Sequence, residues 1–224
     1  MPLRFVNTAA EIFFWIFLLL FIAACAAYLA LAYRGRLRIF KPLCMLLLGL
    51  SFVCLAPQFP LVYLSCFLFA VGDLVSAWQK PLLFALSAVV FAAAQIFMTT
   101  LIVPLISYPV PAYVYAVAVV VIALFALGGY FLHGKKPRLQ SALACAYSGF
   151  PLLNLVLAVL LVVDHPLTGS LFLLLGCLYA TVGDLIVGRA VNASLKREFY
   201  ATIHYLLGQT LIYIGLVLSL AAAL

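Results

Sequence analysis

Long apolar runs separated by short polar segments fill the chain from end to end. Each run approaches the ~20 residues that a helix needs to cross the ~30 Å hydrocarbon core of a bilayer. Runs such as LVLAVLLVV at 155–163 are continuously apolar, whereas the strands of a membrane barrel alternate apolar and polar residues. The pattern predicts an all-α polytopic membrane bundle of eight transmembrane helices, at residues 9–33, 41–56, 60–78, 81–103, 111–132, 138–163, 167–188 and 197–222.

The composition favours the same class of fold. Hydrophobic residues make up 69% of the 224 residues and charged residues 8%, and the mean hydropathy is +1.33. A water-soluble fold of this length needs more polar surface than that. The six cysteines lie inside apolar runs without CxxC spacing, which predicts small core residues rather than disulfides or a zinc site. We therefore expect residues 1–224 to form a single integral membrane domain.

The positive charges indicate how the chain is oriented. Every Lys and Arg except Arg4 falls between the first and second, third and fourth, fifth and sixth, or seventh and eighth predicted helices, or at the first residue of the second, sixth or eighth. This spread between apolar runs does not favour nucleic-acid binding, which needs basic residues on one soluble face. The positive-inside rule makes these segments cytoplasmic. Both termini are thus predicted to face outward, in what we expect to be the bacterial cytoplasmic membrane.

Two segments far apart in the chain resemble each other. CFLFAVGDLV at 66–75 aligns without a gap on CLYATVGDLI at 177–186, and FAAAQ at 91–95 matches YLLGQ at 205–209 more loosely. Because each half would hold an even number of helices, such a repeat is parallel, with its axis along the membrane normal. We expect an internal repeat of residues 1–108 and 109–224.

The repeat contains an aspartate in each half, Asp73 and Asp184, at similar depth in an apolar helix. A charged side chain at the bilayer centre costs at least ~2.5 to 3.5 kcal/mol, so two of the five acidic residues in such places need an explanation. Small residues flank both, which favours close helix packing and inward-facing carboxyl groups. The alternative is that each aspartate only hydrogen-bonds a neighbouring helix. Because two neighbouring carboxyl groups cannot both ionise easily, we expect an acid and base pair.

Other polar side chains lie at nearby depths. A polar stripe with spacings of i, i+3, i+7 and i+11 follows one face of the last predicted helix, and its members are Thr202, Tyr205, Gln209 and Tyr213. Gln95, Thr99 and Asn154 add polar groups on two other helices. Each could simply form a hydrogen bond between helices, which is worth ~0.6 kcal/mol. His204 lies at the depth of the aspartates but beside the stripe. A metal site needs about three converging ligands, so no metal or cofactor is expected.

The ordered motifs resemble the YhhN family of lysoplasmalogenase-like membrane proteins. They are Lys41-Pro42, Gly72-Asp73, FAAAQ at 91–95, Gly183-Asp184, and Tyr205 with Gln209. The resemblance covers the whole chain and implies hydrolysis of the vinyl ether bond of lysoplasmalogens, which gives a fatty aldehyde and glycerophospho-ethanolamine or -choline. The chain departs from the family where a histidine followed three residues later by a tyrosine is usual, since it has Gln95 and Met98 there. Gly183 replaces a usual serine.

An enol ether is hydrolysed by protonation at carbon and attack of water on the resulting oxocarbenium ion. This division of labour resembles that of the two carboxylates of glycosidases. Asp73 and Asp184 are the predicted catalytic pair. A lysoplasmalogen-like lysophospholipid is the predicted partner, and the predicted substrate-binding residues are Lys41, Gln95, Tyr205, Gln209 and His204. Lys41 would attract the lipid phosphate.

Two other functions fit the paired carboxylates. A proton- or cation-coupled transporter or channel could use them as ion sites, although such sites usually lie at the midplane between broken helices. A lipid-binding protein without chemistry is the other alternative.

Overall fold

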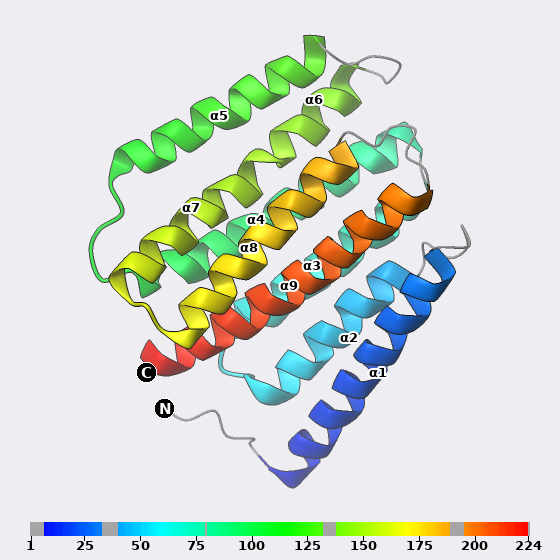
Figure 1. The fold of residues 1–224 in the computed structure, drawn as a ribbon, viewed down its shortest axis with the longest axis vertical. Helices are drawn as coiled ribbons and strands as arrows, with labels where there is room; N and C mark the ends of the chain where they lie inside the picture. The colour runs from blue at the N-terminus through cyan, green and yellow to red at the C-terminus, as the bar shows by residue number, and fades with distance from the viewer. Residues whose placement is uncertain (1–6, 33–39, 79, 132–137, 189–194, 224) are drawn as a thin grey trace.

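The computed structural model describes residues 7–32, 40–78, 80–131, 138–188 and 195–223, which are almost entirely helical (Figure 1). The α-helices in these residues are α1 (Thr8–Ala32), α2 (Phe40–Leu55), α3 (Pro60–Ala77), α4 (Pro81–Ile102), α5 (Ala112–Phe131), α6 (Arg138–Tyr147), α7 (Gly149–Asp164), α8 (Thr168–Gly188) and α9 (Leu195–Ala223). A short 3₁₀ turn, η1 (Val103–Leu105), continues α4. No strand occurs in the described ranges, so the prediction of an all-helical fold is confirmed.

Six stretches of the described chain are long and apolar enough to cross a membrane. They are Thr8–Leu31, Pro60–Ala77, Leu82–Leu105, Ala112–Phe131, Ser141–Asp164 and Phe199–Ala223. α2 and the Thr168–Asp184 part of α8 are apolar but shorter. The chain is therefore a helical membrane protein.

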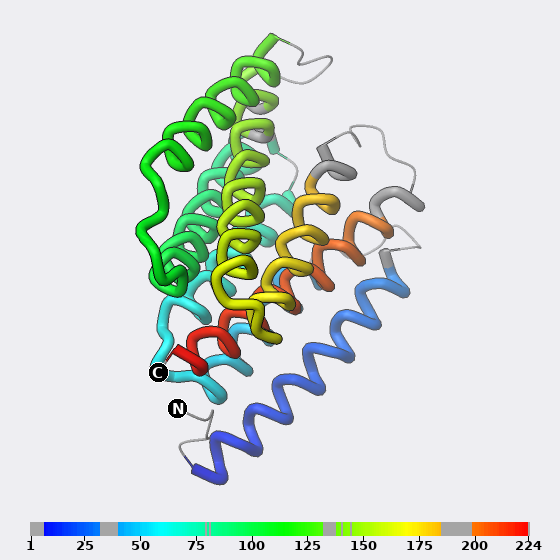
Figure 2. Tube along the Cα trace, turned by 60° about the vertical axis from the view of Figure 1, so that its left-hand side comes forward, coloured from blue at the N-terminus to red at the C-terminus, as the bar shows by residue number. Residues whose placement is uncertain are grey.

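The helices pack as a bundle with α1 and α5 at opposite edges (Figures 1 and 2). α1 lies beside α2, α5 lies beside α6, and the pair α8 and α9 occupies the middle with α3 and α4 behind it. Apolar side chains on the two edge helices are exposed, for example Leu19 at 64% and Val119 at 65%. An apolar exterior around a partly polar interior is the arrangement that a lipid solvent favours.

The prediction of a single helix over 138–163 is wrong. The structure divides this stretch into α6 and α7 at Ser148. Pro151 has no N–H to donate to the carbonyl group of Tyr147, and its ring crowds that carbonyl. The backbone tightens instead, and the N–H of Ser148 donates to Cys145 O at 3.2 Å, an i to i−3 bond. Proline therefore explains the break.

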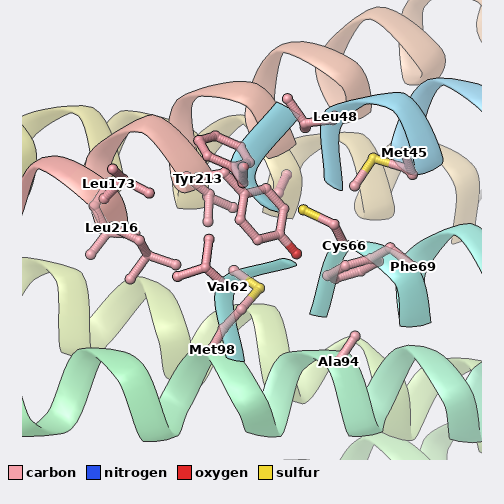
Figure 3. Packing of buried hydrophobic residues seen from close by; sticks show 14 of the residues in the cluster. Met45, Leu48, Val62, Cys66, Phe69, Ala94, Met98, Leu173, Tyr213 and Leu216 are labelled. Atoms are coloured by element: carbon pink, nitrogen blue, oxygen red, sulfur yellow. The ribbon is translucent and has the colours of Figure 1, made fainter. Parts of the chain in front are cut away.

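Close-packed apolar side chains in the interior join α1, α2, α3, α4, α7, α8 and α9 (Figure 3). Tyr213 from α9 reaches Cys66 and Phe69 on α3, and its hydroxyl lies 2.9 Å from Ser65 Oγ. All six cysteines are free, as predicted, and Cys44, Cys66 and Cys177 are buried. The predicted polar stripe on α9 is buried along its length, since no member exceeds 8% exposure.

Glycines bring α8 and α9 into backbone contact. A Cβ atom added at Gly215 would lie 2.4 Å from Leu173 N and 2.7 Å from Gly169 O. At Gly208 it would lie 2.7 Å from Ala180 N, and at Gly176 it would lie 2.5 Å from Ile212 N. Because the obstacles are backbone atoms, no rotamer change can make room. Small residues of this kind are how membrane helices approach closely without a hydrophobic driving force.

The backbone contact between α8 and α9 predicts that the effect of a Gly→Ala substitution on stability depends strongly on its position. Gly215→Ala should lower the free energy of unfolding by about 1 to 3 kcal/mol, the usual cost of overpacking, although alanine is the better helix former. Gly128→Ala on α5 is the matched control, since a Cβ atom there meets nothing within 4 Å. The measurement is the thermal unfolding midpoint of the purified protein. Equal midpoints for the two variants would contradict the backbone contact.

At the end of the bundle away from Asp73 and Asp184, hydrogen bonds of Asp164 join the segment before α5 to the end of α7. Its Oδ2 accepts from the Ser107 backbone N–H at 2.6 Å and its Oδ1 accepts from Ser107 Oγ at 2.7 Å. His165 Nε2 lies 3.4 Å from Oδ2. Asp164 thus has a structural role far from the other two aspartates in helices.

Candidate functional site

Asp73 is the buried centre of an ion-pair cluster. It lies four residues before the end of α3, and its side chain is 0% exposed. Lys41 Nζ lies 2.7 Å from Oδ1, and the Tyr205 hydroxyl donates to Oδ2 at 2.7 Å. The same ammonium group lies 3.8 Å from the centroid of the Tyr205 ring, a cation–π contact. Lys41, Asp73 and Tyr205 thereby join α2, α3 and α9 at one point.

Asp184 lies beside this cluster on α8, four residues before the end of that helix, and is partly exposed. It interacts electrostatically with both Lys41 and Asp73, and Tyr147 on α6 is a further neighbour of its carboxyl group. The two carboxyl groups therefore belong to one site, but their surroundings differ. Asp73 has a cation in direct contact, whereas Asp184 interacts with that cation only at longer range.

Side-chain hydrogen bonds join α4 and α7 near Tyr147, around the Gln95 amide. Asn154 Nδ2 on α7 donates to Gln95 Oε1 at 2.6 Å, and Thr99 Oγ1 donates to Asn154 Oδ1 at 2.7 Å. Gln95 and Asn154 are both 1% exposed. These contacts join α4 to α7.

Sequence reasoning missed Tyr147 as a site residue. A tyrosine near a helix end is common in membrane proteins and carries no signal alone. The usable signal was Ser148-Gly149 followed by Pro151. A proline at that place ends the hydrogen-bond ladder at Tyr147 and sets that residue at a helix end.

Two phenylalanines lie between the tyrosines of the site. The ring centroids of Tyr205 and Phe69 are 6.5 Å apart, those of Phe69 and Phe91 are 5.8 Å apart, and those of Phe91 and Tyr147 are 5.7 Å apart. Gly72 permits this packing, because a Cβ atom there would lie 2.5 Å from the Phe91 ring. The carboxyl groups therefore share an aromatic wall, and its low polarity strengthens the electrostatic interactions beside it.

Gln209 lies one helical turn beyond Tyr205 on the same face of α9 and is 1% exposed. Its Oε1 is buried and has no hydrogen-bond partner among the described residues. A buried carbonyl oxygen in that state is an acceptor available to a water molecule or a ligand hydroxyl.

His204 is placed differently from the other predicted site residues. Its Nδ1 lies 2.7 Å from the Tyr200 carbonyl oxygen of its own helix, and its ring packs 5.7 Å from that of Tyr179. None of the described contacts of Asp73 and Asp184 involves it. The structure brings together Lys41, Asp73 and Tyr205, with Asp184 within electrostatic range. Gln95 is hydrogen-bonded to Asn154 instead, and His204 lies beside the cluster.

No group of three or more His, Cys, Asp or Glu side chains that could hold a metal ion occurs in the described part of the chain. Arg34, Arg36 and Arg38, predicted to lie on the cytoplasmic side, fall outside the described residues.

A comparison with protein-family models, with curated proteins and with solved structures finds no match.

Proposed function

We propose that the protein is a membrane-embedded hydrolase that cleaves the vinyl ether bond of lysoplasmalogens, as its resemblance to the YhhN family implies. The products are a fatty aldehyde and glycerophospho-ethanolamine or -choline. The observation that carries the proposal is the unequal carboxyl pair. Asp73 has Lys41 Nζ at 2.7 Å, whereas Asp184 has no ion pair with a described residue and lies within electrostatic range of Asp73.

The different surroundings of the two carboxyl groups give Asp73 and Asp184 different roles in catalysis. An ammonium ion in contact favours the ionised form of a carboxyl group, and a neighbouring carboxylate favours the protonated form. Asp73 is accordingly the ionised partner, held by Lys41 and Tyr205. Asp184 is the acid, and its partial exposure leaves it accessible to a substrate.

The reaction follows from that division. Asp184 donates its proton to the vinyl carbon that is not bonded to oxygen, and the C=C electron pair forms the new C–H bond. The negative charge of Asp73 stabilises the oxocarbenium ion that results. Water attacks the cationic carbon and gives a proton to the Asp184 carboxylate. The hemiacetal then breaks its bond to the glycerol oxygen. Its hydroxyl group loses a proton as the carbonyl group forms, the glycerol oxygen takes up a proton, and the aldehyde is released.

The membrane arrangement that supports this chemistry has eight spans. In this arrangement α2 and α8 also cross the bilayer, and α6 with α7 forms one kinked span. Asp73 and Asp184 each lie four residues before the end of their helix, which supports two parallel repeats. The basic segments and both aspartates then lie on the cytoplasmic side, where the head group of a lysolipid would lie. The termini face outward.

The test is product analysis by mass spectrometry. The purified full chain, in bilayer nanodiscs, is incubated with a lysoplasmalogen, with its saturated alkyl ether analogue and with an acyl lysolipid. The proposal predicts aldehyde from the vinyl ether alone, because neither the saturated ether nor the ester can be protonated at carbon in this way. Release of fatty acid from the ester alone would overturn it. Ion flux into liposomes without any lipid turnover would favour a transporter instead.

A further inference from the structure

Two tyrosines of α9 join that helix to α3 and fix the register between the two helices. The Tyr205 hydroxyl donates to Asp73 Oδ2 at 2.7 Å. The Tyr213 hydroxyl lies 2.9 Å from Ser65 Oγ. The two contacts are eight residues apart on each helix and follow opposite chain directions, so α3 and α9 are antiparallel and in register.

Gln209 lies midway between these two contacts, four residues from each tyrosine on the same face of α9. The residue at the corresponding position of α3 is Phe69, which is 0% exposed and whose side chain has no hydrogen-bonding group. Tyrosine is longer than glutamine, so the separation of α3 and α9 that the tyrosines span exceeds the reach of Gln209. The α3 side chain at this level therefore offers Gln209 no partner.

The Gln209 amide oxygen lacks a hydrogen-bond donor in the described part of the chain. The side chain is 1% exposed, and Oε1 is buried without a partner there. Gln95 is equally buried, but its Oε1 accepts from Asn154 Nδ2 at 2.6 Å. Buried polar groups are almost always hydrogen-bonded, because an unpaired one costs its full desolvation penalty. Gln209 Oε1 therefore needs a donor other than the described protein atoms.

The two neighbouring tyrosine hydroxyls cannot be that donor, because each gives its hydrogen elsewhere. Tyr205 donates to the Asp73 carboxylate. Ser65 Oγ donates to the Val62 carbonyl oxygen at 2.8 Å, so the Tyr213 hydroxyl must be the donor in its bond with Ser65. Both tyrosine oxygens keep lone pairs that can accept. The amide oxygen and the two hydroxyl oxygens are thus three acceptors in a row, without a free donor among them.

We propose that Gln209 binds an internal water molecule between α3 and α9. The water donates one hydrogen to Gln209 Oε1 and the other to the hydroxyl oxygen of Tyr205 or Tyr213. One helical turn places Gln209 about 6 Å along the axis from either tyrosine, and a water with two hydrogen bonds of about 2.8 Å spans nearly that distance. Water is favoured over a lipid hydroxyl because the glutamine is 1% exposed, which leaves no access for a group attached to a chain. This inference does not rest on the proposed function.

A crystal structure of the full chain, grown without lysolipid and at a resolution that shows ordered waters, tests the site directly. We expect a water within about 2.6 to 3.2 Å of Gln209 Oε1, and within the same range of one of the two tyrosine hydroxyls. Three results would overturn the proposal: Oε1 bonded to a protein atom, no density beside it, or density that appears only after lysolipid is added.

Hydroxyl-radical labelling of the full chain in nanodiscs, without lysolipid, tests the site in a bilayer. Radiolysis of a bound water oxidises the side chains beside it. Phe69 and Tyr213 are both 0% exposed, so radicals formed in bulk water do not reach them. Mass spectrometry should find added oxygen on at least one of the two in the wild type. Gln209→Leu keeps the size of the side chain but removes the acceptor, so this labelling should fall several-fold. Gln209→Met serves if that variant fails to fold.

Gln95→Leu is the matched control, because it makes the same change at a glutamine whose Oε1 already has a protein donor. Its labelling of Phe69 and Tyr213 should equal that of the wild type. Two unlabelled side chains in the wild type, or labelling that the Gln209 variants leave unchanged, would overturn the proposal. Since neither measurement requires turnover, failure of the proposed hydrolysis would leave the water site standing, and a dry site would leave the hydrolysis untouched.

Discussion

Asp184→Asn is expected to lower the rate of aldehyde release from lysoplasmalogen by about 10²- to 10⁴-fold, the usual contribution of a general acid. Asparagine has nearly the same shape as aspartate, but it has no acidic proton to give to carbon. Asp73→Asn should also lose activity, by about 10²- to 10³-fold, because the charge that stabilises the cation is removed. The measurement is the initial rate of aldehyde formation.

Asp164→Asn provides the matched control. It makes the same chemical change at the other end of the bundle, where Asp164 bonds only to Ser107 and His165 among the described residues. Its turnover rate per folded molecule should equal that of the wild type. Full activity in both Asp73→Asn and Asp184→Asn would refute the pair. A larger loss in Asp73→Asn than in Asp184→Asn would reverse the two roles.

Lys41→Met should destabilise the fold by about 2 to 3 kcal/mol. Removal of one partner of a buried ion pair usually costs about 3 to 5 kcal/mol, because it leaves an uncompensated charge. The cost is lower here since the Lys41 side chain is 27% exposed, and since Asp73 can escape part of the penalty by taking up a proton. The free energy of unfolding in detergent or nanodiscs is the quantity to measure.

A double-mutant cycle identifies the cause of this loss. Lys41→Met combined with Asp73→Asn removes both charges, so much of the stability should return relative to Lys41→Met alone. Lys80→Met is the control, because Lys80 is exposed and its loss should change stability by no more than about 0.5 kcal/mol. A double variant no more stable than Lys41→Met would show that packing of the lysine stem, and not its charge, stabilises the fold.

The sequence predicted the helices well because a bilayer imposes a long, continuously apolar pattern on each of them. It also predicted the buried face of α9, since Thr202, Tyr205, Gln209 and Tyr213 repeat at helical spacing and all are buried. Polar residues on one face of a helix in an apolar chain have few places to lie other than the interior.

The break at Ser148 was hidden by its surroundings. The run from 138 to 163 has the length and composition of one spanning helix, and a proline within such a run is tolerated in membranes. Two features of the backbone cause the break. The Tyr147 carbonyl group loses its hydrogen-bond donor, and Gly149 lies so close to α5 that a Cβ atom added to it would be 2.4 Å from Ile122. That close approach is a tertiary contact, which the local pattern does not contain.

The partners of the site residues could not be predicted from the pattern either. Lys41 looks in the sequence like the last basic residue of a cytoplasmic segment, which favours a phosphate-binding role. The packing of α2 against α3 instead brings its ammonium group 2.7 Å from Asp73. The rotation of each helix about its own axis sets such pairs, and apolar residues on every face leave that rotation weakly specified in the sequence.

Hydrolysis carried out in D₂O tests the central claim most directly. If a protonated carboxyl group attacks the vinyl carbon, the exchanged deuteron becomes bonded to the carbon next to the aldehyde carbonyl group. Mass spectrometry of the aldehyde, reduced at once to the alcohol to prevent exchange, should show one deuterium at that carbon. It should be absent when aldehyde of natural isotopic composition is carried through the same procedure. Aldehyde released in D₂O without that deuterium would contradict protonation at carbon and, with it, the acid role of the aspartate pair.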